Sequence, residues 1–211
     1  MIVAIDGPAA AGKGTLARRI ALALGFAHLD TGALYRAVGL RVLRDGMDPS
    51  DATAAHRAAL ALNPADLSGP ALREERTAKA ASVVSAHPAV RAALLDFQRN
   101  FGKNPPGGVP GAVIEGRDIG TVVCPNADIK LFIDADLSIR ARRRHEELRS
   151  NGISVELAEV RAEMAARDDR DRNRADSPLR PAPDAHLLDT TDLDIDGVFA
   201  AAMKAIGGVA K

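Results

Sequence analysis

The sequence is poor in aromatic residues and in cysteine. Aromatic side chains make up 3% of the 211 residues and tryptophan is absent, so the core must be built from Ala, Leu, Val and Ile. The single cysteine, Cys124, excludes an intrachain disulfide and a zinc site built from cysteines. Cys124 itself is expected to be a small buried hydrophobic residue rather than a nucleophile.

The chain also has no excess charge and no long hydrophobic run. Lysine plus arginine and aspartate plus glutamate number 28 each, so no overall field favours DNA, RNA or an anionic membrane. No apolar run is long enough to span a bilayer, and the first predicted strand begins at residue 2, which leaves no room for a signal peptide. We therefore expect a cytoplasmic monomer without nucleic-acid or membrane partners.

The hydrophobic pattern predicts an α/β fold. Residues 2–5 are a continuous apolar run, typical of a strand buried on both faces of a parallel sheet. A helix and a second short strand at 26–29 follow, which completes a βαβ unit. Further strands are expected at 112–115, 129–133 and 186–188, and further helices at 137–149, 154–173 and 195–206. Residues 31–101 are predicted to be helices with breaks, and 102–111 a surface loop rich in glycine and proline.

A glycine-rich segment follows the first strand and opens the first helix. It reads Gly7-Pro8-Ala9-Ala10-Ala11-Gly12-Lys13-Gly14-Thr15. Glycines let backbone N–H groups approach a phosphate chain closely, and the helix that starts after Lys13 aims its positive end at the anion. Lys13 adds a point charge for the β- and γ-phosphates. These nine residues are predicted to form a phosphate-binding loop (P-loop) that binds ATP.

The residue after the lysine departs from the common P-loop pattern. Gly14 stands where a serine or threonine usually offers Mg²⁺ a hydroxyl ligand, and Thr15 comes one position later. We expect Mg²⁺ to be held with ATP mainly by phosphates and waters, and we predict no protein ligand to the metal. The variant is similar to small nucleoside monophosphate kinases, and no Asn-Lys-x-Asp motif supports a GTPase.

Three further segments offer parts for a second substrate. Residues 30–36 follow the second strand, at the end where α/β folds place ligands. There Thr31 is equally suited to cap the next helix or to bind a ligand, and Arg36 could equally face solvent. Val90-Arg91 lies within the helical stretch. Three charged residues at 115–118 lie among glycines just after a predicted strand, which by itself indicates a functional site.

The fourth segment, residues 167–174, is a dense run of arginine and aspartate. Charge density alone favours a solvated helix. The preceding apolar stripe at helical spacing consists of Ile153, Leu157, Val160 and Met164. Its continuation leads to Arg167, Asp171 and Arg174, which indicates a helix running from a core into a polar cleft. The run 140–144 leaves two interpretations open, a set of lid arginines or a solvated face.

In this order, the segments resemble the bacterial cytidylate (CMP) kinase family over nearly the whole chain. The matching stretches are 5–15, 29–36, 87–95, 115–125 and 167–174 with Pro178-Leu179. The resemblance implies transfer of a phosphoryl group from ATP to CMP or dCMP, in pyrimidine nucleotide metabolism. It also implies a three-layer parallel-sheet P-loop kinase with a helical monophosphate-binding lobe and a short helical lid.

The resemblance assigns regions and residues to these tasks. The kinase unit spans 1–211, with a core at about 1–30, 112–140 and 175–211, a monophosphate-binding lobe at 31–111 and a lid at 148–166. Catalysis is assigned to Lys13, Arg117 and Arg174, and ATP binding to Arg143 besides the P-loop. CMP binding is assigned to Thr31, Tyr35, Arg36, Arg91, Arg117, Asp118, Arg167, Asp171 and Arg174. Thr31, Arg91 and Asp118 would recognise cytosine.

Two alternative functions remain at this point. One is another small-molecule P-loop kinase, for UMP, AMP or shikimate. The other is a regulatory P-loop module in which ATP binding drives assembly, although such a switch would not need a second set of phosphate-clamping arginines. The chain also departs from enterobacterial members of the family, which carry a strand-rich insert where this chain has only a short stretch at about 63–76.

Overall fold

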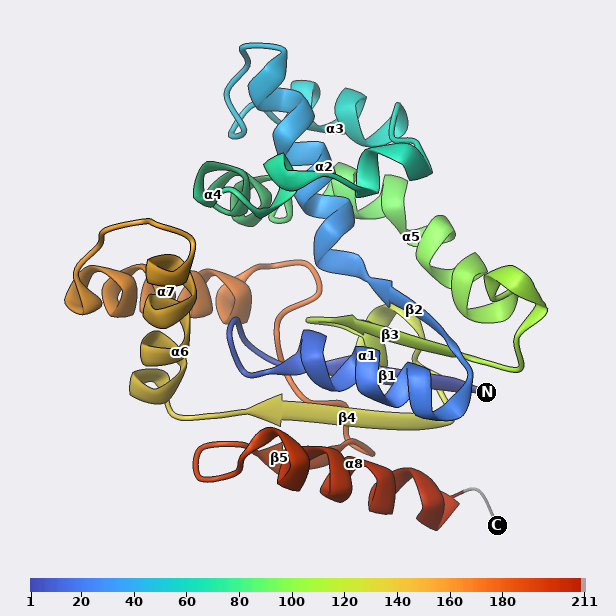
Figure 1. The fold of residues 1–211 in the computed structure, drawn as a ribbon. Coiled ribbons are helices and arrows are strands. Elements are labelled where there is room, and N and C mark those ends of the chain that lie inside the picture. The colour runs from blue at the N-terminus through green and yellow to red at the C-terminus, as the bar shows by residue number, and fades with distance from the viewer. Residues whose placement is uncertain (210–211) are drawn as a thin grey trace. The chain divides into compact units, whose positions relative to one another are not determined.

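The computed structural model describes residues 1–209 and contains a five-stranded sheet with the strand order β2-β3-β1-β4-β5 (Figure 1). The strands are β1 (Ile2–Asp6), β2 (Ala27–Asp30), β3 (Ala112–Gly116), β4 (Ile129–Asp134) and β5 (His186–Asp189). The helices are α1 (Lys13–Leu24), α2 (Thr31–Arg44), α3 (Ala52–Leu60), α4 (Glu75–Val84), α5 (Pro88–Lys103), α6 (Leu137–Ser150), α7 (Leu157–Asn173) and α8 (Ile195–Val209). Shorter helical turns are η1 (Pro64–Leu67), η2 (Pro70–Arg73), η3 (Pro106–Gly108) and η4 (Ile119–Val123).

The central strand β1 pairs in parallel with both β3 and β4, and β5 pairs in parallel with β4. In this register Asp6 lies opposite Gly116 on one side and Phe132 on the other. The carboxyl ends of these strands therefore meet at one edge of the sheet, which is where open α/β sheets bind ligands. The segments that leave this edge are the P-loop, the turn at 117–118 and the start of α6.

Both faces of the sheet are covered. One face packs Val3, Ile5 and Leu131 against α1 and α8 in the main hydrophobic core. On the other face, the last turn of α5 fits closely because Gly102 has no side chain. A Cβ there would lie 3.2 Å from the Cδ1 atoms of both Ile2 and Ile114. The inner strands β1, β3 and β4 are thus buried on both faces, as their largely apolar sequences require. The edge strand β5 is largely exposed.

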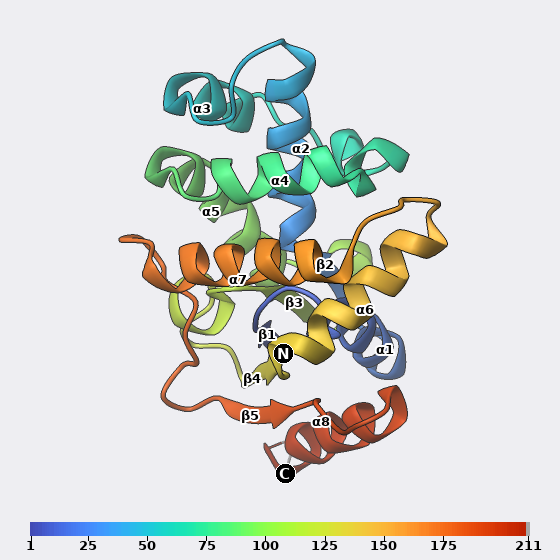
Figure 2. The same cartoon turned by 90° about the vertical axis from the view of Figure 1, so that its left-hand side faces the viewer.

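The chain divides into two compact units, Met1–Leu29 together with the chain from Gly102 onward, and Asp30–Phe101. The second unit is helical and is built around α2, whose residues Leu34, Val38 and Val42 pack in its core. Gly39 lets α2 and α4 approach closely, because a Cβ at Gly39 would lie 2.9 Å from the backbone of α4. In the first unit, α6 and α7 pack against each other (Figure 2).

The α/β class, the parallel sheet and all five strands confirm the sequence predictions. Three details differ. The surface loop expected at 102–111 is shorter, because α5 continues to Lys103 where Gly102 fits against the sheet, and part of the rest forms η3. The helix expected from 154 begins at Leu157, because Glu156 has extended backbone angles. The stretch 63–76 contains two helical turns and the start of α4, in agreement with the prediction of helices with breaks.

The third difference concerns the start of α2. Thr31 was one candidate for its cap, but Asp30 occupies that position and accepts a hydrogen bond from the N–H of Ala33 at 3.2 Å. Thr31 is instead the first helical residue and is buried. Among the described helices, none is long and apolar enough to cross a membrane.

Candidate active site

The P-loop wraps from the end of β1 to the start of α1, and two glycines make this path possible. Gly7 has a φ of +145°, and a Cβ there would lie 1.9 Å from the carbonyl oxygen of Ile133 on β4. Gly12 has a φ of +91° and occupies the N-cap position of α1. Only glycine adopts such angles at low cost. The first turn of α1 therefore presents its backbone N–H groups at the carboxyl edge of the sheet.

Lys13 lies at the centre of this loop and is buried. Its Nζ donates a hydrogen bond to the carbonyl oxygen of Pro8 at 2.6 Å, so the ammonium group is held inside the loop. The pKa of Lys13 is lowered to about 7. Burial is the main cause, the positive charge of Arg117 adds to it, and the negative charge of Glu115 opposes it by a smaller amount. An anion bound in the loop would favour the charged ammonium form.

Asp6, at the end of β1, organises the neighbouring turn. Its two carboxylate oxygens accept hydrogen bonds from the N–H groups of Ile119 and Gly120, each at 2.7 Å. Burial raises the pKa of Asp6 to about 6, although these two hydrogen bonds oppose the rise. Asp6 therefore fixes the start of η4, and with it the two preceding residues, Arg117 and Asp118, next to the P-loop.

A cluster of arginine and aspartate forms where the turn after β3 meets the end of α7. The Nε of Arg117 donates to Oδ2 of Asp171 at 3.1 Å. Arg174 lies 3.7 Å from Oδ1 of Asp118 and 3.9 Å from Oδ1 of Asp171, and its Nε donates to the carbonyl oxygen of Ser177 at 2.6 Å. These side chains come from segments more than fifty residues apart, and only the fold brings them together.

The arginines of this cluster determine the charge of Asp171. Burial pushes the pKa of Asp171 upward. The charges of Arg117, Arg167 and Arg174 outweigh this effect and hold the pKa below its usual value. Asp171 is therefore an anion at neutral pH, and it orders the arginines around it. The charges of Arg117 and Arg167 also act on Lys13, so the arginine–aspartate cluster lies near the P-loop lysine.

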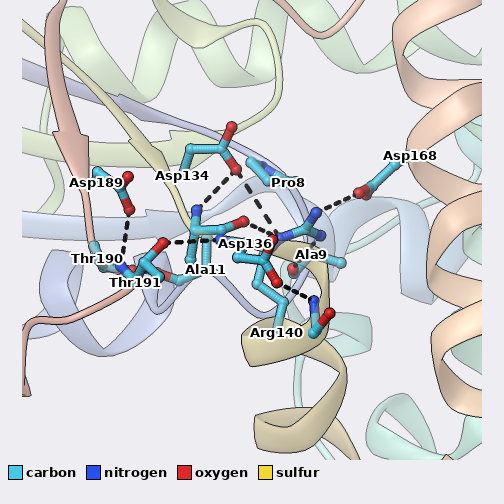
Figure 3. A network of polar contacts seen from close by, with 12 residues as sticks. Pro8, Ala9, Ala11, Asp134, Asp136, Arg140, Asp168, Asp189, Thr190 and Thr191 are labelled. Atoms are coloured by element: carbon cyan, nitrogen blue, oxygen red, sulfur yellow. Dashed lines mark hydrogen bonds and ion pairs between the residues drawn. The ribbon is translucent and has the colours of Figure 1, made fainter.

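Side chains from α6 and from the residue after β5 donate hydrogen bonds to carbonyl groups of the P-loop (Figure 3). Arg140 of α6 donates to the carbonyl oxygen of Ala9 at 3.3 Å and to Oδ2 of Asp168 at 2.7 Å. Thr190, just after β5, donates from its hydroxyl to the carbonyl oxygen of Ala11 at 3.3 Å. Arg143, predicted to bind ATP, donates to the carbonyl oxygen of Thr190 at 2.8 Å. Contact between Arg143 and ATP stays a prediction.

In the helical unit, two predicted CMP-binding arginines each contact a side chain close by. The guanidinium of Arg36 donates to Oδ2 of Asp30 at 2.5 Å, so Arg36 is not simply solvated. The guanidinium of Arg91 lies over the ring of Tyr35, 5.6 Å from its centroid, and donates to the carbonyl oxygen of Ser85 at 3.3 Å. Arg91 is buried on α5, which a residue of a solvated helix face would not be.

Sequence reasoning missed Asp6, Asp168 and Thr190, and it left the role of Arg140 open. A signal for Asp168 was present, because Val160, Met164 and Asp168 recur at intervals of four along α7. The predicted stripe instead continued through Arg167 and Asp171. Asp168 and Asp171 are buried and Arg167 is partly buried, but Ile153 and Leu157, the first two members of the predicted apolar stripe, are exposed. No sequence pattern pointed to Thr190, whose partner lies in the distant P-loop.

Comparison with known proteins decides which P-loop family this site belongs to. A family model described as cytidylate kinase matches residues 3–207. The chain belongs to the cytidylate kinase family. A curated cytidylate kinase from Paramagnetospirillum magneticum is 58% identical over 98% of this chain and 97% of its own length. One from Rhodospirillum rubrum is 56% identical over 96% of this chain and 95% of its own length.

Among solved structures, an uncharacterized protein from Eubacterium ventriosum matches with a TM-score of 0.56 over 98% of each chain, at 14% identity. At this identity the likeness concerns the fold alone. Membership of the cytidylate kinase family rests on the family model and on the relatives that align over nearly their whole length. The family resemblance drawn from the P-loop, the turn after β3 and the end of α7 is therefore confirmed.

Proposed function

We propose that the protein transfers the γ-phosphoryl group of ATP to CMP or dCMP, forming ADP and CDP or dCDP. The observation that carries this proposal is the position of the Arg117 and Arg174 cluster beside the P-loop lysine of the first unit. A buried Lys13 in a P-loop suits the donor triphosphate, and Arg117 and Arg174 beside it suit a second phosphate. A regulatory P-loop module has no need for that second set of arginines, and the relatives are named cytidylate kinases.

Phosphoryl transfer passes through a loose transition state, so the protein contributes alignment and charge neutralisation rather than covalent chemistry. An oxygen of the CMP phosphate attacks the γ-phosphorus in line, and the bond to the bridging oxygen of ADP breaks. Lys13 moves from the carbonyl of Pro8 to the phosphate oxygens and stabilises the charge that develops there. No general base is required, because the attacking phosphate is already ionised at pH 7.

The acceptor residues are proposed from the resemblance together with the geometry of each unit. Arg117, Arg174 and Arg36 bind the CMP phosphate, while Asp171 with Arg167 binds the ribose hydroxyls. Cytosine offers an amino donor that a carboxylate accepts and ring acceptors that suit arginine or a hydroxyl. We assign base recognition to Asp118, Arg91 and Thr31, with Tyr35 holding Arg91. Residues 148–166 act as a lid that excludes water during transfer.

The residues present fit a Mg²⁺ ion that is carried mainly by the nucleotide. Both oxygens of Asp6 are occupied by backbone N–H groups, and Glu115 contacts His28 at 2.9 Å. Within residues 1–209, no group of three or more His, Cys, Asp or Glu side chains could hold a metal ion. When bound, Mg²⁺ supplies charge neutralisation on the β- and γ-phosphate oxygens. We propose that the enzyme works as a cytoplasmic monomer.

The proposed function is tested by measuring ADP release in a coupled assay with Mg-ATP and a panel of nucleoside monophosphates. We expect turnover with CMP and dCMP well above that with UMP and AMP. Turnover mainly with UMP or AMP would favour another small-molecule kinase. If no monophosphate supports ADP release by the folded protein, the kinase proposal is wrong.

Nucleotide binding is expected to take up a proton above pH 7. In the free protein the pKa of Lys13 is about 7, so Lys13 is mostly neutral at pH 8. Bound phosphates favour the ammonium form and raise this pKa, so ATP affinity should fall as the pH rises from 7 to 9. Calorimetry of ATP binding at pH 8, in buffers of different ionisation enthalpy, measures the proton uptake.

The matched control for this linkage is Lys13→Met, which removes the titrating group. The variant should bind ATP more weakly and without the proton uptake seen in the wild type. Asp6 does not interfere, because its pKa of about 6 leaves it ionised at pH 8. Proton uptake that persists unchanged in Lys13→Met would assign the linkage to a different group.

A further inference from the structure

Arg140 is among the most deeply buried charged side chains of the first unit, with 2% of its side chain exposed. Its guanidinium donates hydrogen bonds to three separate segments (Figure 3). Nε donates to the carbonyl oxygen of Ala135 at 2.9 Å, Nη1 to that of Ala9 at 3.3 Å and Nη2 to Asp168 at 2.7 Å. Arg140 thus joins the end of β4, the P-loop and α7 through one rigid group.

A contribution to folding stability alone would not explain why Arg140 and Asp168 are buried together. Arg140 lies in the first turn of α6, where the helix dipole disfavours a cation. The carboxylate of Asp168 is 4% exposed, and within the described part of the chain its Oδ1 has no hydrogen-bond partner. Buried ion pairs are costly to desolvate, and apolar residues of similar volume often stabilise a protein as well or better.

The contact with Ala9 sets the direction of a backbone group in the P-loop. In a trans peptide, the carbonyl oxygen of one residue and the N–H of the next point in opposite directions. Arg140 holds the carbonyl of Ala9, so the N–H of Ala10 is turned away from Arg140. Ala10 itself has a φ of +57°, which a residue other than glycine rarely adopts. An external contact is therefore well placed to maintain this conformation.

The contact with Asp168 fixes α7 at the same time. Asp168 follows Arg167 directly and precedes Asp171 by three residues, less than one helical turn. Asp171 in turn orders Arg117 and Arg174. The hydrophobic contacts of this region follow the same path, because Ala9 and Ala10 pack against the cluster of Val160, Met164 and Leu148. Rotation or sliding of α7 would therefore move the acceptor arginines relative to the P-loop.

We propose that Arg140 and Asp168 are positioning residues that keep the P-loop in register with the arginines of α7 for phosphoryl transfer. This inference rests on the proposed function. Neither residue needs to touch a substrate. Arg140 fixes the orientation of the Ala9–Ala10 peptide in the loop that binds ATP. Through its ion pair with Arg140, Asp168 fixes the position of α7, which carries residues proposed to bind CMP. The pair serves alignment, to which phosphoryl transfer is especially sensitive.

The decisive experiment uses the double variant Arg140→Met/Asp168→Leu, which removes both buried charges together. Because no unpaired charge is left behind, this variant is expected to fold with a melting temperature close to that of the wild type. The single variants Arg140→Met and Asp168→Leu each strand one buried charge and should be less stable. Arg140→Lys keeps the charge but cannot reach three acceptors with the same fixed geometry.

The readouts are kcat and the KM values for ATP and CMP, measured at a temperature where each variant is folded. The double variant should lose about 10- to 100-fold in kcat, the scale of a small misalignment, and its KM for ATP should rise. Arg140→Lys should lie between it and the wild type. Glu146→Gln, at an exposed position of the same helix, is the control and should keep wild-type kinetics.

The outcomes separate this inference from the proposed function. If the folded double variant keeps kcat and both KM values within about twofold of the wild type, the pair is only structural and the inference is wrong. If Arg140→Lys folds but loses as much kcat as the double variant, the planar guanidinium and not the charge alone is required, which supports the inference. If the wild type itself does not phosphorylate CMP, the proposed function fails, whatever the variants do.

Discussion

Replacing Lys13 by alanine is expected to lower kcat by on the order of 10²–10³, the effect of removing one preorganised charge-stabilising donor. The ammonium group of Lys13 lies inside the P-loop, where it donates to the carbonyl oxygen of Pro8. We expect the same ammonium group to contact the phosphate oxygens on which charge develops in the transition state. Because that charge develops during transfer, the loss should appear mainly in kcat rather than in the KM for CMP.

Loss of stability would not explain this result. Burial of the Lys13 ammonium lowers its pKa to about 7, which means that the folded protein disfavours the charge. An apolar replacement of similar length, Lys13→Met, should therefore be at least as stable as the wild type in thermal unfolding while losing kcat as Lys13→Ala does. Lys204→Met, at an exposed position of α8, should leave both activity and melting temperature unchanged. An active Lys13→Met enzyme would remove Lys13 from the mechanism.

Replacing Arg117 by alanine is expected to lower kcat by a similar factor, on the order of 10²–10³. Arg117 lies at the carboxyl end of β3, and its Nε is directed by the carboxylate of Asp171 at 3.1 Å. Its Nη1 also donates to the carbonyl oxygen of Gly116 at 3.2 Å, and we expect the remaining N–H groups of the fork to bind the acceptor phosphate. Its loss also removes one of the charges that hold the pKa of Asp171 low.

The matched variants separate charge from geometry. Arg117→Lys retains a positive charge but not the planar fork, so its kcat should fall between those of the wild type and Arg117→Ala. Arg180→Ala, which removes an exposed arginine of the same unit, should behave as the wild type. Steady-state kinetics with varied CMP measures both constants. Wild-type kcat and KM for CMP in Arg117→Ala would refute the assignment of Arg117 to the acceptor phosphate.

Local sequence was sufficient where one segment carries the whole signal. The P-loop could be predicted because its glycines, its lysine and the flanking strand and helix are contiguous, and each imposes a backbone requirement that can be read directly. The structure gives the reason for Gly7 in particular, since a side chain there would overlap the carbonyl of Ile133. The parallel sheet followed from apolar runs that are buried on both faces.

Prediction failed where the partner of a residue lies far away in the chain. The cap of α2 is a local case, where Asp30 instead of Thr31 accepts the hydrogen bond from the N–H of Ala33. The length of α5 depended on whether Gly102 could fit against Ile2 and Ile114. The run at 140–144 had two interpretations, and burial of Arg140 against Ala9 and Asp168 resolved one of its members.

The sequence by itself determined the phosphate-binding loop, the α/β class and the identity of the charged segments that suit an acceptor nucleotide. Only the tertiary structure decided that Arg117, Asp171 and Arg174 meet, and that Arg140 and Thr190 hold the carbonyl groups of the loop. The physical reason is the range of the interactions. Backbone angles and helical periodicity act within a few residues, whereas hydrogen bonds and ion pairs between buried side chains depend on parallel strands that bring distant segments to one edge of the sheet.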